Sequence, residues 1–334
     1  MLKFLYLALS SLNEIICGKV TGTPEETLGT VLLLCMIEIC DGKSTKWSWH
    51  ISAAQTIIRS KSKTKSSSTT WKFLLAMFGY VDSVITISKC QPPLISLKEL
   101  AEDGGISDAN HNSASRMNEA PYKSHNEALF GVAQPLFDMI GKISALANRR
   151  KDRVDEISEI WFLQSATAIE KGLREWEPDS GARFDEVSAS AAERRSNNDI
   201  ANAAQAIKWA SILRLHQVVH GYMASDHCVA ECTSHILTYI SMVRFGSSAE
   251  SILIFPLVMA AAGCGDDEQR IMVNERWLVM ERTIGFDNIY QAREMVDAVW
   301  RAVDEGRKDG SNNGGLSVNW ARIRHDEFPG VVLL

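Results

Sequence analysis

The residue types best suited to bind a metal gather in one stretch of the sequence, at His227, Cys228, Cys232 and His235. On a helix, Cys228, Cys232 and His235 stand at i, i+4 and i+7, which places all three on one face. Thiolate and imidazole are good ligands for zinc. Structural zinc, however, takes its ligands from two converging elements, and no second half with suitable spacing occurs in the chain. We therefore interpret the stretch as a buried helix face with a partly exposed histidine.

A second pair of histidines has the spacing that zinc metalloproteases use. His216 and His220 stand four residues apart, but those enzymes place a glutamate directly after the first histidine. Gln217 occupies that place here and cannot act as a general base. Glycine-rich phosphate-binding loops and the Gly-x-Ser-x-Gly nucleophile motif do not occur either. The sequence therefore predicts no catalytic residue, no cofactor and no metal site.

An acidic triplet, Asp266-Asp267-Glu268, has the residue types with which helical isoprenoid enzymes hold magnesium. Such enzymes need a second acidic motif that faces the first. The nearest candidate, Asn198-Asp199, lacks the serine or threonine and the glutamate that should follow at helical spacing. Carboxylates are also stabilised at helix N-termini, where the helix dipole is positive. We therefore interpret the triplet as the start of a helix.

A run of basic residues interrupts the apolar pattern early in the chain. It consists of Arg59, Lys61, Lys63, Lys65 and Lys72, interleaved with serines rather than aromatic residues. Spaced lysines of this kind occur in nuclear localisation signals and in contacts to nucleic acid. A solvated loop is the commoner setting, and we favour it here.

The composition is that of a soluble globular chain, with 46% apolar and 23% charged residues among 334. Wholesale disorder is therefore excluded. The net charge of −6 argues against a free-standing nucleic-acid binder, which would carry a basic face. Seven cysteines without any C-x-x-C pair exclude a compact disulfide framework and the usual zinc ribbons. Isolated cysteines in apolar runs fit a reducing compartment.

Two apolar stretches could be taken for membrane segments. Residues 251–265 are uncharged, but the stretch contains Pro256 and is shorter than the roughly 20 residues of a spanning helix. The N-terminal run after Lys3 resembles a secretory signal, yet only one positive charge precedes it and the cleavage site is poor. We expect both stretches to be core helices, and no membrane as a partner.

Helical periodicity dominates the chain. Thr23 can cap a helix, Pro24 suits its first position, and Glu26 can complete a capping box. Gly42 can end the same helix in the left-handed conformation. Residues 71–90 are rich in β-branched residues, so a strand is one reading, but the helical neighbours favour a helix there as well.

Neither a fixed-period repeat nor an alternation of strands and helices occurs. We therefore predict an all-α fold, a single large domain over residues 1–334 with about 10–13 helices around one continuous core. Polar segments without helical period predict an insert at 103–125 and loops at 59–70, 179–199 and 306–319.

Five residues stand in a familiar order around the end of the first predicted helix: Glu38, Gly42, Trp49, His50 and Ala53. This order resembles the signature of the fungal-specific transcription factor domain 2, the regulatory domain of fungal zinc-cluster transcription factors. In that family, Glu-x-x-x-Gly is followed by Trp-x-x-His-x-x-Gly-Ala, and Ala53 stands where the family usually has glycine. Trp49 offers a large apolar surface for burial, with an N–H that needs a partner.

Further matches to this family follow in the same order. Trp176 and Pro178 stand in an element similar to the family's Glu-x-x-Leu-x-x-Trp-x-Pro. Pro256 and Gly263 stand in one similar to Pro-Leu-Phe-x-Ala-Gly-Cys, with two additional alanines. The residues that then follow at family-like spacing are Arg270, Trp277, Gly285, Asn288, Ala292 and Trp300. The resemblance covers most of the chain from about residue 20, and it implies structural roles for these residues.

The resemblance implies an all-helical regulatory domain that acts in the nucleus and controls transcription. The partners that it implies are a second copy of the chain, the transcription machinery or co-regulators, and a small-molecule effector. DNA would be contacted only through a six-cysteine zinc cluster, which is missing from this sequence. A truncated gene, an excised regulatory domain and a diverged relative remain open. Two other functions stay as alternatives, namely an isoprenoid-type enzyme and a helical scaffold subunit without a transcriptional role.

Overall fold

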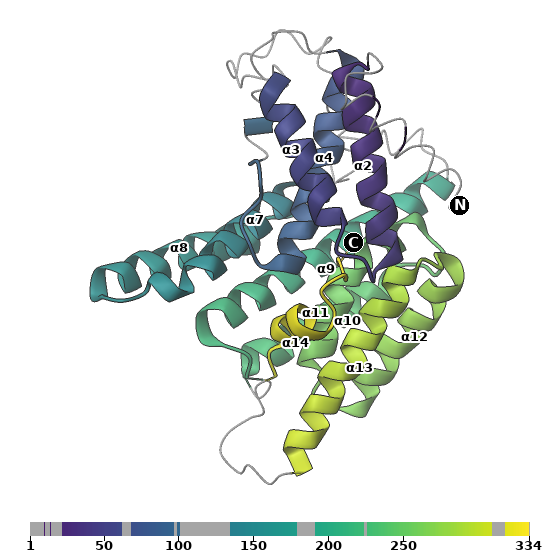
Figure 1. The fold of residues 1–334 in the computed structure, drawn as a ribbon. Coiled ribbons are helices and arrows are strands. Elements are labelled where there is room, and N and C mark those ends of the chain that lie inside the picture. Colours follow the sequence, from purple (N-terminus) through teal and green to yellow (C-terminus); the bar gives the residue numbers. More distant parts are fainter. Residues whose placement is uncertain are drawn as a thin grey trace.

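The computed structural model describes residues 22–61, 68–96, 99–100, 134–178, 191–223, 226–308 and 318–333, together with Ser10 and Glu14. Within these ranges the chain forms eleven α-helices, two 3-10 helices and no β-strand (Figure 1). The α-helices are α2 (Pro24–Asp41), α3 (Trp47–Lys61), α4 (Thr69–Lys89), α7 (Gln134–Asn148), α8 (Glu156–Glu175), α9 (Ala191–His220), α10 (His227–Met242), α11 (Ile254–Gly263), α12 (Asp267–Thr283), α13 (Asp287–Lys308) and α14 (Trp320–Glu327). The 3-10 helices are η2 (Arg149–Asp152) and η3 (Ser248–Leu253). The prediction of an all-α fold is confirmed.

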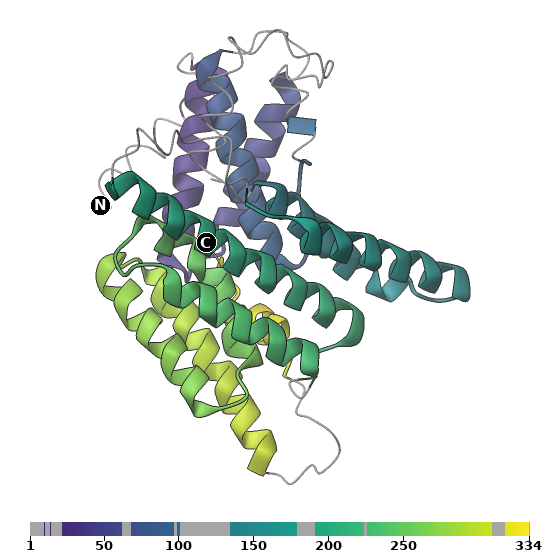
Figure 2. The same ribbon diagram turned by 180° about the vertical axis from the view of Figure 1, so that it is seen from behind.

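The long helix α9 is the central helix of the described fold. Its 30 residues cross the molecule (Figure 2) and pack against α7, α8, α10, α11 and η3. Helices α2, α3 and α4 form a group at one end, and α12 and α13 lie at the other (Figure 1). The C-terminal tail returns to the first group, where the backbone N–H of Leu333 donates to Ser88 Oγ at 2.8 Å. One core therefore joins the first and last described helices.

The predicted start and end of the first described helix are confirmed. The backbone N–H of Glu26 donates to Thr23 Oγ1 (3.2 Å), and that of Thr23 donates to Glu26 Oε2 (2.9 Å), which completes the capping box. Pro24 occupies the first turn, where a missing N–H costs nothing. Gly42 ends the helix with a φ of +70°, in the left-handed region.

Two apolar helices lie inside the core. Helix α4 is the one described helix long and apolar enough to cross a membrane by length and composition, but 72% of that window is buried within the fold. It packs on α2, α3 and α7. Helix α11, within the apolar stretch 251–265, is buried almost throughout, as predicted. The N-terminal run after Lys3 lies outside the described residues.

A buried ion pair ties α12 to η3. Arg276 Nη1 lies 2.9 Å from Glu250 Oε1, and the two side chains are 4% and 1% exposed. Arg276 Nη2 also donates to the carbonyl oxygens of Ile240 and Val243, both at 2.6 Å, at the C-terminal end of α10. Thr283 donates to the second oxygen of Glu250 at 3.0 Å. The pair thus fixes three elements at one point.

The polar segments predicted as loops are helical at their edges. Helix α3 continues to Lys61 and α4 begins at Thr69, so both ends of the segment 59–70 were misassigned. Helix α9 begins at Ala191, so residues 191–199 are helical rather than loop. Alanine, glutamate and arginine favour helices without an apolar stripe, and this first part of α9 shows none that periodicity could detect.

The other segments predicted as loops agree more closely with the structure where it describes them. Helix α13 continues to Lys308, three residues into the predicted loop 306–319, and residues 318–319 precede α14 without helical structure. The insert predicted at 103–125 lies outside the described residues, as do residues 179–190.

Candidate functional site

The first motif residues meet the end of the chain at a close contact between the α2–α3 turn, α13 and the tail. A Cβ atom on Gly42 would stand 2.6 Å from the Cα atom of Asn288, at the start of α13. A Cβ atom on Gly330 would stand 2.5 Å from the carbonyl of Lys43. Trp47 Nε1 donates to the carbonyl oxygen of Gly330 at 3.2 Å. Only glycine allows this approach, so these residues join distant parts of the chain.

The interpretation of Trp49 as the buried tryptophan is wrong. Trp49 is 72% exposed, whereas Trp47 is 1% exposed and makes the hydrogen bond. The pattern Trp-x-x-His, counted back from His50, falls on Trp47. His50 is half-buried, and burial lowers the pKa of its imidazole. Ala53 points outward and Glu38 is half-buried, so neither lies in the core.

The second motif marks the capped C-terminus of α8. The helix ends at Glu175, and Trp176 and Pro178 continue in extended backbone. The ammonium of Lys208, a residue of α9 that is 5% exposed, donates to the carbonyl oxygen of Trp176 (2.7 Å) and to Glu177 Oε1 (3.0 Å). A buried cation thus satisfies the last carbonyls of α8 and holds the helix against α9.

The third motif allows α11 to approach α10. A Cβ atom on Gly263 would stand 2.2 Å from Thr233 Oγ1, so no larger residue fits without a shift of the two helices. Pro256 is buried in the first turn of α11, where its fixed φ suits the helix. These two residues therefore set the position and the start of the most buried helix.

The last motif residues hold α13 in place. Gly285 precedes α13 with a φ of +70°, and Asn288 is buried in its first turn. Trp300 Nε1 donates to the carbonyl oxygen of Ala261 at 2.9 Å, which attaches the middle of α13 to α11. These contacts join α13 to the α2–α3 turn and to α11.

The candidate zinc ligands on α10 do not converge. Cys228 Sγ and Cys232 Sγ are 4.0 Å apart, and burial raises the pKa of both thiols. The ring of His235 stacks on Trp209 with 3.9 Å between centroids. Across the described ranges, no group of three histidine, cysteine or acidic side chains is arranged to hold a metal ion.

The second histidine pair also has a local partner. His216 Nε2 lies 3.0 Å from Asp226 Oδ2, and the rings of His216 and His220 are 4.7 Å apart. Asp226 is itself the N-cap of α10, since its other oxygen accepts from the backbone N–H of Cys228 at 2.9 Å. The histidines therefore help to connect α9 with α10.

The two charged clusters have structural partners as well. Asp266 Oδ1 accepts from the backbone N–H of Gln269 at 2.8 Å, which confirms the triplet as a helix N-terminus. In the basic run, Lys61 Nζ contacts Glu25 Oε1 at 2.5 Å and lies 4.0 Å from the centre of the Trp71 ring. Lys61 is therefore anchored on α2 and α4 rather than solvated in a loop. Lys63 and Lys65 lie outside the described residues.

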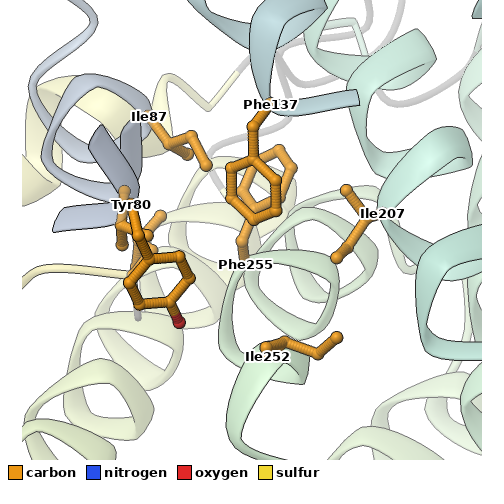
Figure 3. A pocket seen from close by; sticks show the side chains of 8 residues that line it. Tyr80, Ile87, Phe137, Ile207, Ile252 and Phe255 are labelled. Atoms are coloured by element: carbon orange, nitrogen blue, oxygen red, sulfur yellow. The ribbon is translucent and has the colours of Figure 1, made fainter. Parts of the chain in front are cut away.

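A small apolar cavity lies in the core between α4, α7, α9 and α11. Figure 3 shows aromatic and aliphatic side chains that surround it, among them Tyr80, Phe137, Ile207 and Phe255. Its volume of about 10 Å³ is at the lower limit for one water molecule. Without a rearrangement of the core, no effector fits there.

A much larger cleft, of about 400 Å³, opens where the C-terminal ends of α4, α7 and α9 meet α14. This volume falls within the range of small-ligand sites, about 300–1,000 Å³. Ser88 in its wall accepts the hydrogen bond from the tail. Arg324, also in the wall, donates to the carbonyl oxygens of Val331 (2.7 Å) and Pro329 (3.1 Å). A molecule in the cleft would contact groups that hold the tail.

Helix α8 projects from the body of the molecule (Figures 1 and 2). Its first turns and the preceding residue 154 carry exposed apolar side chains at nearly helical spacing. These are Val154, Ile157, Ile160 and Trp161. Exposed apolar side chains grouped in this way mark interaction surfaces. We call these four residues the α8 stripe.

The family model with the description "Fungal specific transcription factor domain" matches residues 1–331. The chain belongs to this family. The comparisons with curated proteins and with solved structures returned no match. The assignment confirms the resemblance that the ordered motifs indicated.

In this fungal specific transcription factor domain, the motif residues hold the helices, while the cleft uses other residues. The cleft was not predicted from the sequence because its residues come from five separate elements and form no motif. One signal was present in the sequence. Arg214, which lines the cleft, is the one charged residue in α9 between residues 209 and 215.

Proposed function

We propose that this domain is the regulatory module of a nuclear transcription factor and that an effector or a partner changes its output. Membership of the family over residues 1–331 carries the proposal, because the family is one of transcription factors. DNA would be bound through a zinc cluster that is not part of this sequence. Co-regulators or the transcription machinery would receive the output.

The cleft beside α14 is the place where an effector would act. Its walls include residues of α4 and α14, and Ser88 and Arg324 in these walls hold the tail. A ligand that binds one arrangement of these elements more tightly than another shifts the population toward that arrangement. Docking of the tail on α4 is the change that this cleft would control.

A second copy of the chain is the partner that we propose for the α8 stripe. Two identical stripes can pair around a twofold axis, because each then covers the other. Ile157→Glu should convert a dimer into a monomer in light scattering at micromolar concentration. Phe286→Glu, at an exposed apolar residue outside α8, is the matched control and should leave the mass unchanged. A wild-type monomer at 100 µM would contradict this proposal.

The test of the regulatory function is a reporter assay in which the chain is fused to an unrelated DNA-binding domain. The fusion should raise or lower transcription relative to the DNA-binding domain alone, and the effect should depend on nutrients. A reporter that does not respond under any condition would favour the scaffold alternative. The enzyme alternative needs two facing acidic clusters, and in the described fold Asp266 serves as a helix cap.

A further inference from the structure

The wall of the cleft carries an excess of positive charge. Its basic residues come from α4, η2, α9 and α14. They are Lys89, Arg150, Arg214, Arg322, Arg324 and His325. No aspartate or glutamate belongs to the wall in the part of the chain that the structure describes. Two carboxylates act on the wall from outside it. Asp326 lies 3.4 Å from the exposed guanidinium of Arg322, and the buried Asp82 interacts with Lys89.

Arg214 is buried without a carboxylate partner among the described residues. It is 8% exposed, and it donates to the hydroxyl of Tyr222 (2.8 Å) and to Cys90 Sγ (3.0 Å). Its guanidinium also lies 5.1 Å from the centre of the Trp320 ring. Neutral partners satisfy N–H groups but do not balance a buried charge, which costs several kcal/mol when it is unpaired.

Arg324 adds a second buried charge in the same wall. It is 4% exposed, and carbonyl oxygens of the tail are its hydrogen-bond partners. Burial lowers its pKa to about 10. Burial and the charge of Arg324 lower the pKa of Lys89, while the carboxylate of Asp82 acts in the opposite direction. Lys89 and Arg324 thus repel one another in the wall.

Groups of the fold itself offset only part of the positive charge of these residues. Helices α4, α7 and α9 end at the cleft, and the negative end of each helix dipole has the equivalent of about half an elementary charge. Three such ends offset about half of the charge of Lys89, Arg214 and Arg324. An anion in the cleft would supply the missing counter-charge.

We propose that the cleft binds a small phosphate-bearing molecule, and that this molecule is the effector of the regulatory function proposed above. Guanidinium groups match the geometry of phosphate oxygens with paired N–H donors. Two buried arginines and further cations at the rim favour an anion of more than one charge. The buried position of Arg214 and Arg324 favours a molecule that enters the cleft over the backbone of a duplex that lies on the surface.

The binding test is calorimetry on the full chain with pyrophosphate as the probe, in 0.15 M KCl. We expect saturable binding of one pyrophosphate per chain. Arg150→Ser with Arg322→Ser removes two exposed rim charges without touching the core, and should weaken binding about tenfold. Arg214→Lys retains the charge but loses the paired donors, and should also weaken binding about tenfold. Arg282→Ser with Arg301→Ser, two exposed arginines outside the cleft, is the matched control and should bind as wild type does.

Three results would overturn this proposal. They are no binding at millimolar pyrophosphate, equal weakening by the control pair, and duplex DNA that binds through the same arginines while pyrophosphate fails to displace it. The reporter fusion separates this proposal from the function on which it rests. If the fusion regulates transcription but pyrophosphate does not bind, the anion site is wrong and the regulatory function stands. If pyrophosphate binds as expected but the fusion does not change transcription of the reporter, the anion site stands and its role as an effector site is wrong.

Discussion

Arg276 and Arg214 are both almost fully buried, at 3% and 8% exposure, but their surroundings differ. Arg276, at the junction of α10, η3 and α12, faces the carboxylate of Glu250 at 2.9 Å. Arg214, in the cleft beside α14, donates to a tyrosine hydroxyl and a cysteine sulfur. The first charge is balanced within the protein. The second has no carboxylate partner among the residues that the structure describes.

The presence or absence of a carboxylate partner distinguishes Arg276, a structural cation, from Arg214, which is available to a ligand. A matched pair such as Arg276 and Glu250 fixes the helices that it joins, and removal of either partner leaves an isolated charge in the core. An unmatched cation on a cleft wall gains its counter-charge only when an anion enters. The two regions should therefore lose stability to very different extents when their charges are removed, and the four predictions below test that contrast.

Glu250→Gln should have the largest effect. The substitution keeps the shape of the side chain but leaves Arg276 as an unpaired buried charge, so the free energy of unfolding should fall by about 4 kcal/mol. Urea unfolding measures the loss. The control is Glu281→Gln, which removes the half-buried partner of Arg293 and should cost only about 1 kcal/mol. Equal losses in the two variants would mean that burial of the pair does not matter.

Asp82 is a buried carboxylate near the cleft that, like Arg214, has hydrogen-bond partners without charge. Its Oδ2 accepts from the backbone N–H groups of Leu94 (2.8 Å) and Ile95 (3.2 Å), and burial raises its pKa to about 6. Between pH 4 and pH 6 the folded state therefore binds more protons than the unfolded state. Stability contributed by this group is present below pH 4 and is lost as the pH rises to 6, by about 2 kcal/mol.

The check on Asp82 is urea unfolding of the wild type and of Asp82→Asn at several values of pH. Asparagine can still accept both backbone hydrogen bonds but does not ionise. The stability of the wild type relative to the variant should fall from about pH 4, through pH 6, and stay level above about pH 7. A difference that is flat over this interval would show that Asp82 is already ionised at pH 4, as a partnered carboxylate would be.

The sequence predicts the helix ends of this fold better than its charge pairs. Thr23, Glu26 and Gly42 act through residues three or four positions away or through their own φ, so their types alone indicate their roles. The helix over residues 191–199 was not predicted because a polar helix has no periodic pattern of apolar residues. Trp49 was assigned to the family motif although Trp47 has the Trp-x-x-His spacing, and the burial of Trp47 and its contact to Gly330 separate the two.

The cleft could not be predicted for a different reason. Arg214 and Arg324 are 110 positions apart, and their closeness depends on the tail that returns to α4. The partners of a charge are set by packing between helices, which local spacing does not encode. An arginine within an apolar run indicates that something balances it, but it does not tell whether the partner is a glutamate of this chain or a ligand.

Arg214→Met should destabilise the protein far less than Glu250→Gln. The variant loses two hydrogen bonds to neutral groups but also removes an unbalanced buried charge, and methionine retains much of the apolar contact. The net loss in the free energy of unfolding should be about 1 kcal/mol. A loss near 4 kcal/mol would place Arg214 with Arg276, as a structural cation whose counter-charge belongs to the protein.

Arg322→Ser should have the smallest effect on stability and so separates folding from binding most cleanly. The side chain is 80% exposed, and its contact with Asp326 at 3.4 Å spans one helical turn on the surface. Exposed pairs of this kind contribute little, so the free energy of unfolding should change by less than about 0.5 kcal/mol. Thermal unfolding in 1 mM pyrophosphate should nevertheless show a smaller rise in Tm for the variant than for the wild type, because the rim charge contributes only when the anion is present. If the rise is the same for both, Arg322 lies outside the site and the anion is held by the buried arginines alone.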